Sequence, residues 1–216
     1  MADLAAIFIT SYIVGLSGAL MPGPVSAIAV SESARCGFRA GPLVTVGHAI
    51  AEVAIVAALA MGLSSVLQHR FIAAAIGLLG GAFLMWMGAE MAVSAWQGRV
   101  SLDRADVSPS GMARLGLVPA GVFTSLANPY WFLWWATVGA SYILLSLRHG
   151  VVGLAAFYGG HISADLGWHC LLAFAATSGR RAMGDRAYRA IVFICGLFLV
   201  GMSFYFIMGG IKFVRG

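Results

Sequence analysis

Two segments of the sequence share the pattern Gly-His-x-x-Ala followed by an acidic residue. The first contains His48 and Glu52, and the second contains His161 and Asp165, 113 residues further along the chain. In both segments the imidazole and the carboxylate are four residues apart, a spacing that places them on one face of an α-helix. Such a pair can hold and transfer a proton, and it can also bind a cation.

Both pairs fall near the middle of a long apolar run, 40–68 for the first and 150–178 for the second. If these runs cross a membrane, Glu52 and Asp165 lie near its centre. A charged side chain there is costly and by default marks a functional site. Neighbouring polar residues extend the same helical faces: Thr45 in the first run, and Tyr158 and His169 in the second.

Three interpretations of these residues remain open. They could be hydrogen-bonding contacts that only hold helices together. They could couple protons to transport, because burial brings the pKa values of carboxylic acids and imidazoles closer together. They could also bind a divalent metal ion through nitrogen and oxygen ligands. The metal interpretation uses five residues: His48, Glu52, His161, Asp165 and His169.

The composition indicates the solvent that surrounds the helices. Of the 216 residues, 61% are hydrophobic and only 10% are charged, against about 45–50% and about 25% in ordinary soluble domains. We therefore predict an all-α integral membrane protein, in which residues 1–216 form a single transmembrane domain of six helices. The apolar runs that predict these helices cover 4–36, 40–68, 71–96, 112–146, 150–178 and 188–212.

The basic residues exclude several functions. Lys212 is the single lysine, so the chain cannot contain a phosphate-binding loop with its lysine, and it carries no ATPase of its own. The net charge is +5, but the arginines are scattered through loops between apolar runs, which argues against a nucleic-acid partner. We expect neither an enzyme nor a cofactor.

The arginines also predict the orientation of the chain. The connections after the first, third and fifth runs carry two, three and four arginines, whereas the opposite side carries four basic residues in all. Basic loops tend to stay in the cytoplasm. Both termini are therefore expected outside the cytoplasm.

Two of the runs are too long for a straight span. Runs 4–36 and 112–146 would each reach about 50 Å as one helix, against a hydrocarbon core of about 30 Å. The first is interrupted by Pro22-Gly23-Pro24 and the second by Asn128-Pro129. Because proline breaks the helical hydrogen-bond ladder, both helices should break there. The freed backbone N–H and carbonyl groups are suited to bind a substrate.

The interruptions and the histidine motifs occur at matching places in the two halves of the chain. Breaks fall in the first and fourth runs, and the Gly-His-x-x-Ala-acid pattern falls in the second and fifth. A repeat of three spans reverses its direction in the second copy. We therefore predict two inverted-topology repeats, residues 1–98 and 112–216.

Three further features carry structural expectations. Gly77, Gly81 and Gly88 lie on one face of the third run, which suits close helix packing and also a homodimer contact. The aromatic residues within 130–135 are expected mainly to face lipid or to pack between helices. Glu32 lies near the end of its run, where a solvated carboxylate needs no functional explanation.

Several of these motifs together resemble the lysine exporter (LysE/RhtB) family of amino-acid efflux carriers. The resemblance covers essentially the whole chain. It rests on Pro22-Gly23-Pro24 followed by Gly37-Phe38-Arg39-Ala40-Gly41, on Gly81-Ala82-Phe83-Leu84 with Gly88, and on Asn128-Pro129 after Gly121-Val122-Phe123.

The resemblance implies export of amino acids or similar small metabolites, driven by an ion gradient across a prokaryotic inner membrane. It places the substrate site around Pro22, Gly23, Pro24, Asn128 and Pro129. The chain also departs from the family pattern, since Tyr130 stands where members often have lysine after Asn-Pro. Related families in the same superfamily export metal ions, which keeps a metal substrate under consideration.

Our leading hypothesis is therefore a secondary exporter that works by alternating access between the two repeats. In it the helix breaks hold the substrate, and His48, Glu52, His161 and Asp165 couple protons. The alternative is a divalent-cation exporter that also uses His169. A scaffold protein that transports nothing is a third hypothesis, in which the polar residues serve packing alone.

Overall fold

The computed structural model describes every residue except 1, 22, 63–68, 100–110, 181–184 and 216. The described residues form helices and contain no strand, which confirms the all-α prediction. The helices are α1 (Ala2–Ala19), α2 (Pro24–Cys36), α3 (Ala40–Ala60), α5 (Arg70–Ala75), η1 (Ile76–Gly80), α6 (Gly81–Trp96), η2 (Gly111–Leu115), α7 (Leu117–Leu126), α8 (Pro129–Trp134), η3 (Trp135–Gly139), α9 (Ala140–Leu147), α10 (Gly150–Arg180) and α11 (Asp185–Arg215).

The first long run is broken where its prolines predict. Helix α1 ends at Ala19, α2 begins at Pro24, and the two helices meet at 79°. Gly23 is extended, and Pro24 occupies the first turn of α2, where its missing N–H costs no helical hydrogen bond. Pro22 lies outside the described residues.

The second long run is broken at Asn128-Pro129. Asn128 is extended, as expected for a residue that precedes proline. Its side-chain Oδ1 accepts a hydrogen bond from the backbone N–H of Tyr130 at 3.1 Å and so caps α8. From Pro129 the helix continues through α8, η3 and α9 to Leu147, with one wider π-helical turn at η3.

Several helices have the length and apolarity of membrane spans. Four qualify singly, namely Ala40–Ala60, Arg70–Trp96, Pro129–Leu147 and Asp185–Val214, and the bent pair α1–α2 counts as a fifth. Helix α10 has 31 residues but is less apolar, because His161, Asp165 and His169 lie within it. The chain is therefore a multi-pass membrane protein.

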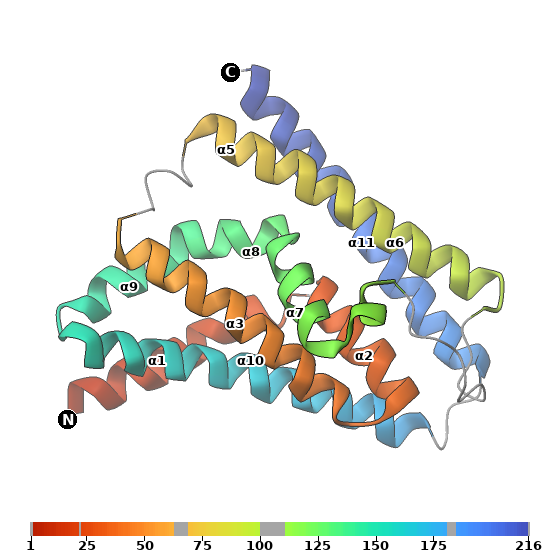
Figure 1. The fold of residues 1–216 in the computed structure, drawn as a ribbon, viewed down its shortest axis with the longest axis horizontal. Helices are drawn as coiled ribbons and strands as arrows, with labels where there is room; N and C mark the ends of the chain where they lie inside the picture. Colours follow the sequence, from red (N-terminus) through yellow and green to blue (C-terminus); the bar gives the residue numbers. More distant parts are fainter. Residues whose placement is uncertain (1, 22, 63–68, 100–110, 181–184, 216) are drawn as a thin grey trace.

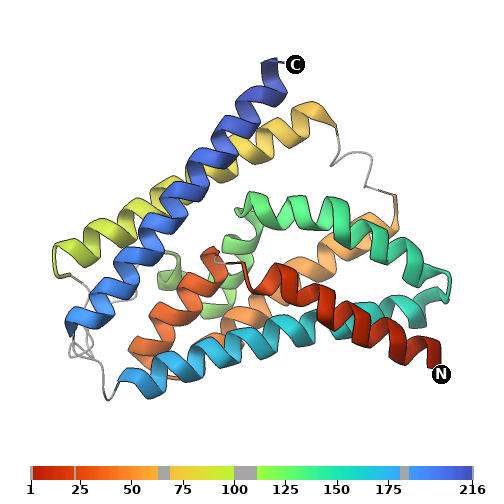
Figure 2. The ribbon, with the colours of Figure 1, turned by 180° about the vertical axis from the view of Figure 1, so that it is seen from behind.

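Three helix pairs make the most extensive contacts: α6 with α11, α1 with α10, and α3 with α7. In both views α5 and α6 run alongside α11, with their chain directions opposed (Figures 1 and 2). A Cβ at Gly88 would lie 2.6 Å from the carbonyl oxygen of Gly196, and one at Gly77 would lie 3.2 Å from Gly210 Cα. The predicted glycine stripe of the third run thus packs against α11 of the same chain, which leaves it unavailable for a homodimer contact.

Two groups of helix ends lie far apart in the molecule, while the beginning of α5 and the end of α11 lie together at a third place (Figures 1 and 2). In the first group the last turns of α2, α6 and α10 meet the beginning of α11, through Ala34, Ala95, Ala176 and Val192. In the second group α1, α3, α9 and α10 share a larger apolar cluster. Its buried members include Ile7, Leu59, Ile143 and Phe157.

The expectation that Glu32 is solvated is wrong. Its exposed fraction is 2%, and its Oε2 accepts hydrogen bonds from Nε of Arg35 at 2.8 Å and from Nη2 at 2.6 Å. The sequence could not show this burial, because it follows from the position of α2 among α3, α7, α10 and α11.

Candidate functional site

The two histidine–carboxylate pairs meet where α3 faces α10. Nε2 of His161 lies 2.9 Å from Oε1 of Glu52 and 3.3 Å from Oδ2 of Asp165. Nε2 of His48 lies 3.1 Å from the same Glu52 oxygen and 3.9 Å from Asp165 Oδ2. All four side chains are buried. Each imidazole therefore lies between the carboxylate of its own helix and the carboxylate of the other helix.

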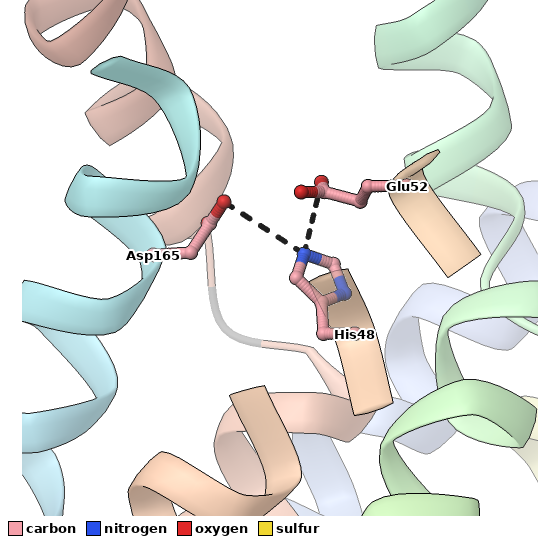
Figure 3. Close-up of side chains that lie close together, drawn as sticks. All are labelled: His48, Glu52 and Asp165. Atoms are coloured by element: carbon pink, nitrogen blue, oxygen red, sulfur yellow. Dashed lines mark ion pairs between the residues drawn. The ribbon is translucent and has the colours of Figure 1, made fainter. Parts of the chain in front are cut away.

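Figure 3 shows the His48 side of this arrangement. His48 and Glu52 project from α3, Asp165 projects from α10, and the two carboxylates point toward the same imidazole nitrogen. The residues that the sequence places in two separate motifs thus form one cluster, which we call the acid–histidine cluster (His48, Glu52, His161 and Asp165).

A serine of α7 orients His48. Oγ of Ser125 lies 2.7 Å from the carbonyl oxygen of Gly121 and 2.6 Å from Nδ1 of His48, so its hydroxyl either donates to the carbonyl and accepts from Nδ1–H, or donates to Nδ1. With a proton on Nδ1, the 3.1 Å contact between His48 Nε2 and Glu52 requires a second proton. In the first case the site holds this extra proton, on the imidazole or on the carboxyl; in the second, a neutral imidazole donates its Nε2–H to Glu52.

Aromatic rings enclose His161. Its ring centroid lies 4.6 Å from that of Trp134 and 5.0 Å from that of Trp135. Both tryptophans are buried, as is Trp131. The tryptophans of α8 and η3 therefore pack between helices, as expected for the aromatic residues within 130–135, and they form a wall around His161.

His169 lies close to the cluster but has different partners. Its Nδ1 is 3.1 Å from Oγ1 of Thr45 on α3, and its Nε2 is 3.4 Å from Oγ of Ser26 on α2. Among the described residues, the ligand atoms that lie within 4.8 Å of one another belong to His48, Glu52 and Asp165. The predicted set of five metal ligands is thus not brought together as one group.

A cavity of about 50 Å³ joins the acid–histidine cluster to both helix breaks. Its wall includes Gly23 from the first break and Asn128 from the second, and Pro24 and Pro129 are buried next to these residues. Residues from the two sites that the sequence predicts separately therefore line one cavity. The cavity is also lined by His48, Glu52, His161, Asp165, His169, Ser26, Tyr130, Trp131, Trp134 and Trp135.

Some polar atoms of the cluster have no hydrogen-bond partner within the described part of the chain. They are Oε2 of Glu52, Nδ1 of His161 and Oδ2 of Asp165; the last lies within ion-pair distance of both imidazoles but accepts no hydrogen bond from them. An unpaired buried polar atom is costly and calls for an explanation. Glu52 and Asp165 line the cavity, so their oxygens are candidates for contact with a bound substrate, whereas Nδ1 of His161 faces Gly15 of α1, which is not part of the lining.

Comparison with known proteins agrees with the motifs and the fold. The model of the LysE type translocator family matches residues 16–210. The chain belongs to this family. A Bacillus subtilis relative described as "Putative amino acid efflux protein YcgF" is 25% identical over 219 residues, which cover 97% of this chain and 99% of the relative. No solved structure gives a significant match.

Membership of the LysE type translocator family confirms the resemblance and makes the chain a transporter rather than an enzyme. Sequence reasoning had missed several parts of the translocator's site, notably Ser125, Ser26 and the tryptophan wall. One signal for Ser125 was present, since the polar pair Thr124-Ser125 interrupts an apolar run one turn before Asn128-Pro129. The stacking of tryptophans on His161 has no comparable local signal.

Proposed function

We propose that this translocator is a secondary exporter of amino acids or related small metabolites, that it is coupled to protons, and that it works by alternating access between two inverted repeats. The observation that carries the proposal is the single cavity that joins both helix breaks to the acid–histidine cluster. The efflux activity in the name of the Bacillus subtilis relative supports the direction of transport and the class of substrate.

The helix contacts support repeats at 1–98 and 112–216. If α1 corresponds to α7 and α3 to α10, the contact of α3 with α7 corresponds to the contact of α10 with α1. Equivalent glycines lie at both contacts. Gly47 approaches the backbone of α7 at Val118, and Gly160 approaches that of α1 at Phe8. In this arrangement α10 is the fifth of six spans, and α6 pairs with its counterpart α11.

The distribution of arginine supports the proposed orientation. Arg35 and Arg39 lie beside the end of α2, and Arg186 and Arg189 lie at the beginning of α11, which are the helix ends that meet through the Ala34 cluster. Under the positive-inside rule this end faces the cytoplasm. Both termini are then outside the cytoplasm, in a cell inner membrane.

The substrate site that we propose comprises Pro22, Gly23, Pro24, Asn128 and Pro129. The two breaks differ in one respect: Asn128 caps α8 with its side chain, whereas Gly23 has no side chain with which to cap α2. The first-turn amides of α2 are suited to the carboxylate of an amino acid. The oxygens of Glu52 and Asp165 that lack hydrogen-bond partners among the described residues are suited to its ammonium group.

The coupling follows from competition at the acid–histidine cluster. When Nδ1 of His48 donates to Ser125, the contact of Nε2 with Glu52 requires a second proton, which this cluster can release. An ammonium group bound to the same carboxylates displaces that proton, because two positive charges in one buried cluster repel each other. In the proposed mechanism, the carrier switches between its inward-open and outward-open states with either the proton or the substrate bound. It therefore moves substrate in one direction and protons in the other.

Transport by the purified protein in liposomes tests this proposal. Amino-acid flux should respond to an imposed pH gradient, and the response should disappear in the double variant Glu52→Gln, Asp165→Asn. Glu90→Gln is the matched control, because Glu90 lies on α6 and does not line the cavity. A pH-driven flux that survives the double variant unchanged would rule out the coupling role.

The divalent-cation alternative is not favoured. The family match and the efflux relative point to amino acids. The geometry agrees with them, since in the described structure His169 is engaged by hydroxyl groups rather than by the cluster.

A further inference from the structure

A second, apolar cavity adjoins the substrate cavity. It has a volume of about 300 Å³ and lies between α2, α10 and α11. We call it the apolar groove. Gly23 and Ser26 line both the groove and the substrate cavity, so the two spaces meet at the beginning of α2. The rest of the groove is mainly hydrophobic, including Val30, Trp168, Leu172, Ile194, Cys195 and Phe198.

The two spaces differ in size and in chemistry. The substrate cavity, at about 50 Å³, has room for only a few water-sized groups. It can hold the ammonium and carboxylate groups of an amino acid, but not a large side chain as well. The groove is about six times larger and has no charged residue among its described lining residues.

We propose that the side chain of the transported amino acid occupies the apolar groove, so that the preferred substrates are zwitterionic amino acids with a large aliphatic or aromatic side chain. This inference rests on the proposed function. Lysine and glutamate fit less well, because each would place a second charge among apolar residues. Gly23 and Ser26 line both spaces, and this adjacency to the substrate cavity favours a substrate side chain over a lipid chain as the occupant.

Competition measured in liposomes tests the preference. Leucine and phenylalanine should compete with a labelled amino-acid substrate about 10- to 100-fold more strongly than alanine does, as expected from burial of several additional carbon atoms in an apolar pocket. Lysine and glutamate should compete weakly. Alanine competing as well as leucine would overturn the inference and leave the proposed function standing. A wild-type protein that transports no amino acid would overturn the proposed function itself.

A variant that fills the groove links the preference to this place in the molecule. Cys195→Phe adds a ring inside the groove, and it should bring the ratio of leucine to alanine affinity close to one. Leu197→Phe is the matched control, since Leu197 is on the same helix, is exposed and does not line the groove. If the Cys195→Phe protein folds and retains the wild-type ratio of leucine to alanine affinity, the inference is overturned. That result is expected if a lipid chain, rather than the substrate, occupies the groove.

Thiol labelling provides a measurement that does not depend on how Cys195→Phe folds. In a protein with Cys36→Ser and Cys170→Ser, Cys195 is the remaining cysteine. Saturating leucine should slow its reaction with a small maleimide several-fold, whereas saturating alanine should have little effect. Equal rates with leucine and with alanine would overturn the inference.

Discussion

Nε2 of His161 lies 2.9 Å from Oε1 of Glu52, although the two residues are 109 positions apart and belong to different helices. The contact joins α10 to α3, and in the proposed repeat arrangement it joins one half of the protein to the other. A movement between the halves would change this contact directly. In the proposed mechanism, the cluster therefore responds to the conformation of the transporter as well as to its substrate.

The two carboxylates of the cluster should contribute unequally to coupling. Glu52 has the shorter contacts, 2.9 Å to His161 and 3.1 Å to His48, whereas Asp165 lies at 3.3 and 3.9 Å from the same two residues. Loss of a charged hydrogen bond is worth about 1.5–3 kcal/mol, or about 10- to 100-fold. We expect Glu52→Gln to reduce pH-driven efflux by this factor and Asp165→Asn to reduce it less. An equal loss of pH-driven efflux in the two variants would contradict the prediction that Glu52 contributes more than Asp165.

Ser125 should affect the protonation of His48 through its hydrogen bond. Ser125→Ala leaves Nδ1 of His48 without this partner, at a cost of about 1–3 kcal/mol for a buried group. We expect a shifted pH profile of transport with the protein still folded. Thr124→Ala is the control, because the Thr124 hydroxyl donates to the Ala120 carbonyl of its own helix. A pH profile that moves equally in both variants would show that the Ser125 contact has no special role.

The predictable and unpredictable parts of this site differ in their physical origin. Proline in a long apolar run and an acid four residues after a histidine are local signals, so the breaks and the polar faces of α3 and α10 could be predicted. In contrast, Asn128 and Glu52 line one cavity only because of tertiary packing. The burial of Glu32 also depends on tertiary packing, although its ion pair with Arg35, three residues later, is a local feature of the sequence.

The glycines at the equivalent helix contacts should be sensitive to a single methyl group. A Cβ at Gly47 would meet the backbone carbonyl of Val118, and one at Gly160 would meet that of Phe8. We expect Gly47→Ala and Gly160→Ala each to destabilise the protein by about 1–3 kcal/mol through overpacking. Thermal unfolding in detergent measures this effect.

Gly201 of α11 provides the control for these substitutions. A Cβ there meets nothing within 4 Å, and the residue is helical. Gly201→Ala should therefore be neutral or stabilising by up to about 1 kcal/mol. If Gly47→Ala and Gly160→Ala melt like Gly201→Ala, the close helix contacts are not tight in solution.

The cluster should bind Zn²⁺ only weakly. Among the described residues, the group whose ligand atoms all lie within 4.8 Å of one another is His48, Glu52 and Asp165, one ligand short of four; it does not include His161, and His169 is held by Thr45 and Ser26. Tight zinc sites usually have four protein ligands rich in nitrogen or sulfur. Protein purified without a histidine tag should therefore carry much less than one zinc per chain. If the wild-type protein instead carries one zinc per chain and the His48→Ala variant loses it, the metal-export hypothesis would be favoured over amino-acid export.

His169 should be separable from proton coupling, although it lines the same cavity as His161. Its counterpart in the other half, 113 residues earlier, is Val56. Its ring nitrogens face hydroxyl groups, whereas Nε2 of His161 faces two carboxylates. A glutamine can replace hydrogen bonds to hydroxyls but cannot carry the proton of an imidazolium. We therefore expect His169→Gln to retain efflux that follows the pH gradient, and His161→Gln to lose it by about tenfold or more. Efflux driven by a pH gradient in liposomes distinguishes the two variants, and an equal loss of coupling in both would show that His169 also carries the proton.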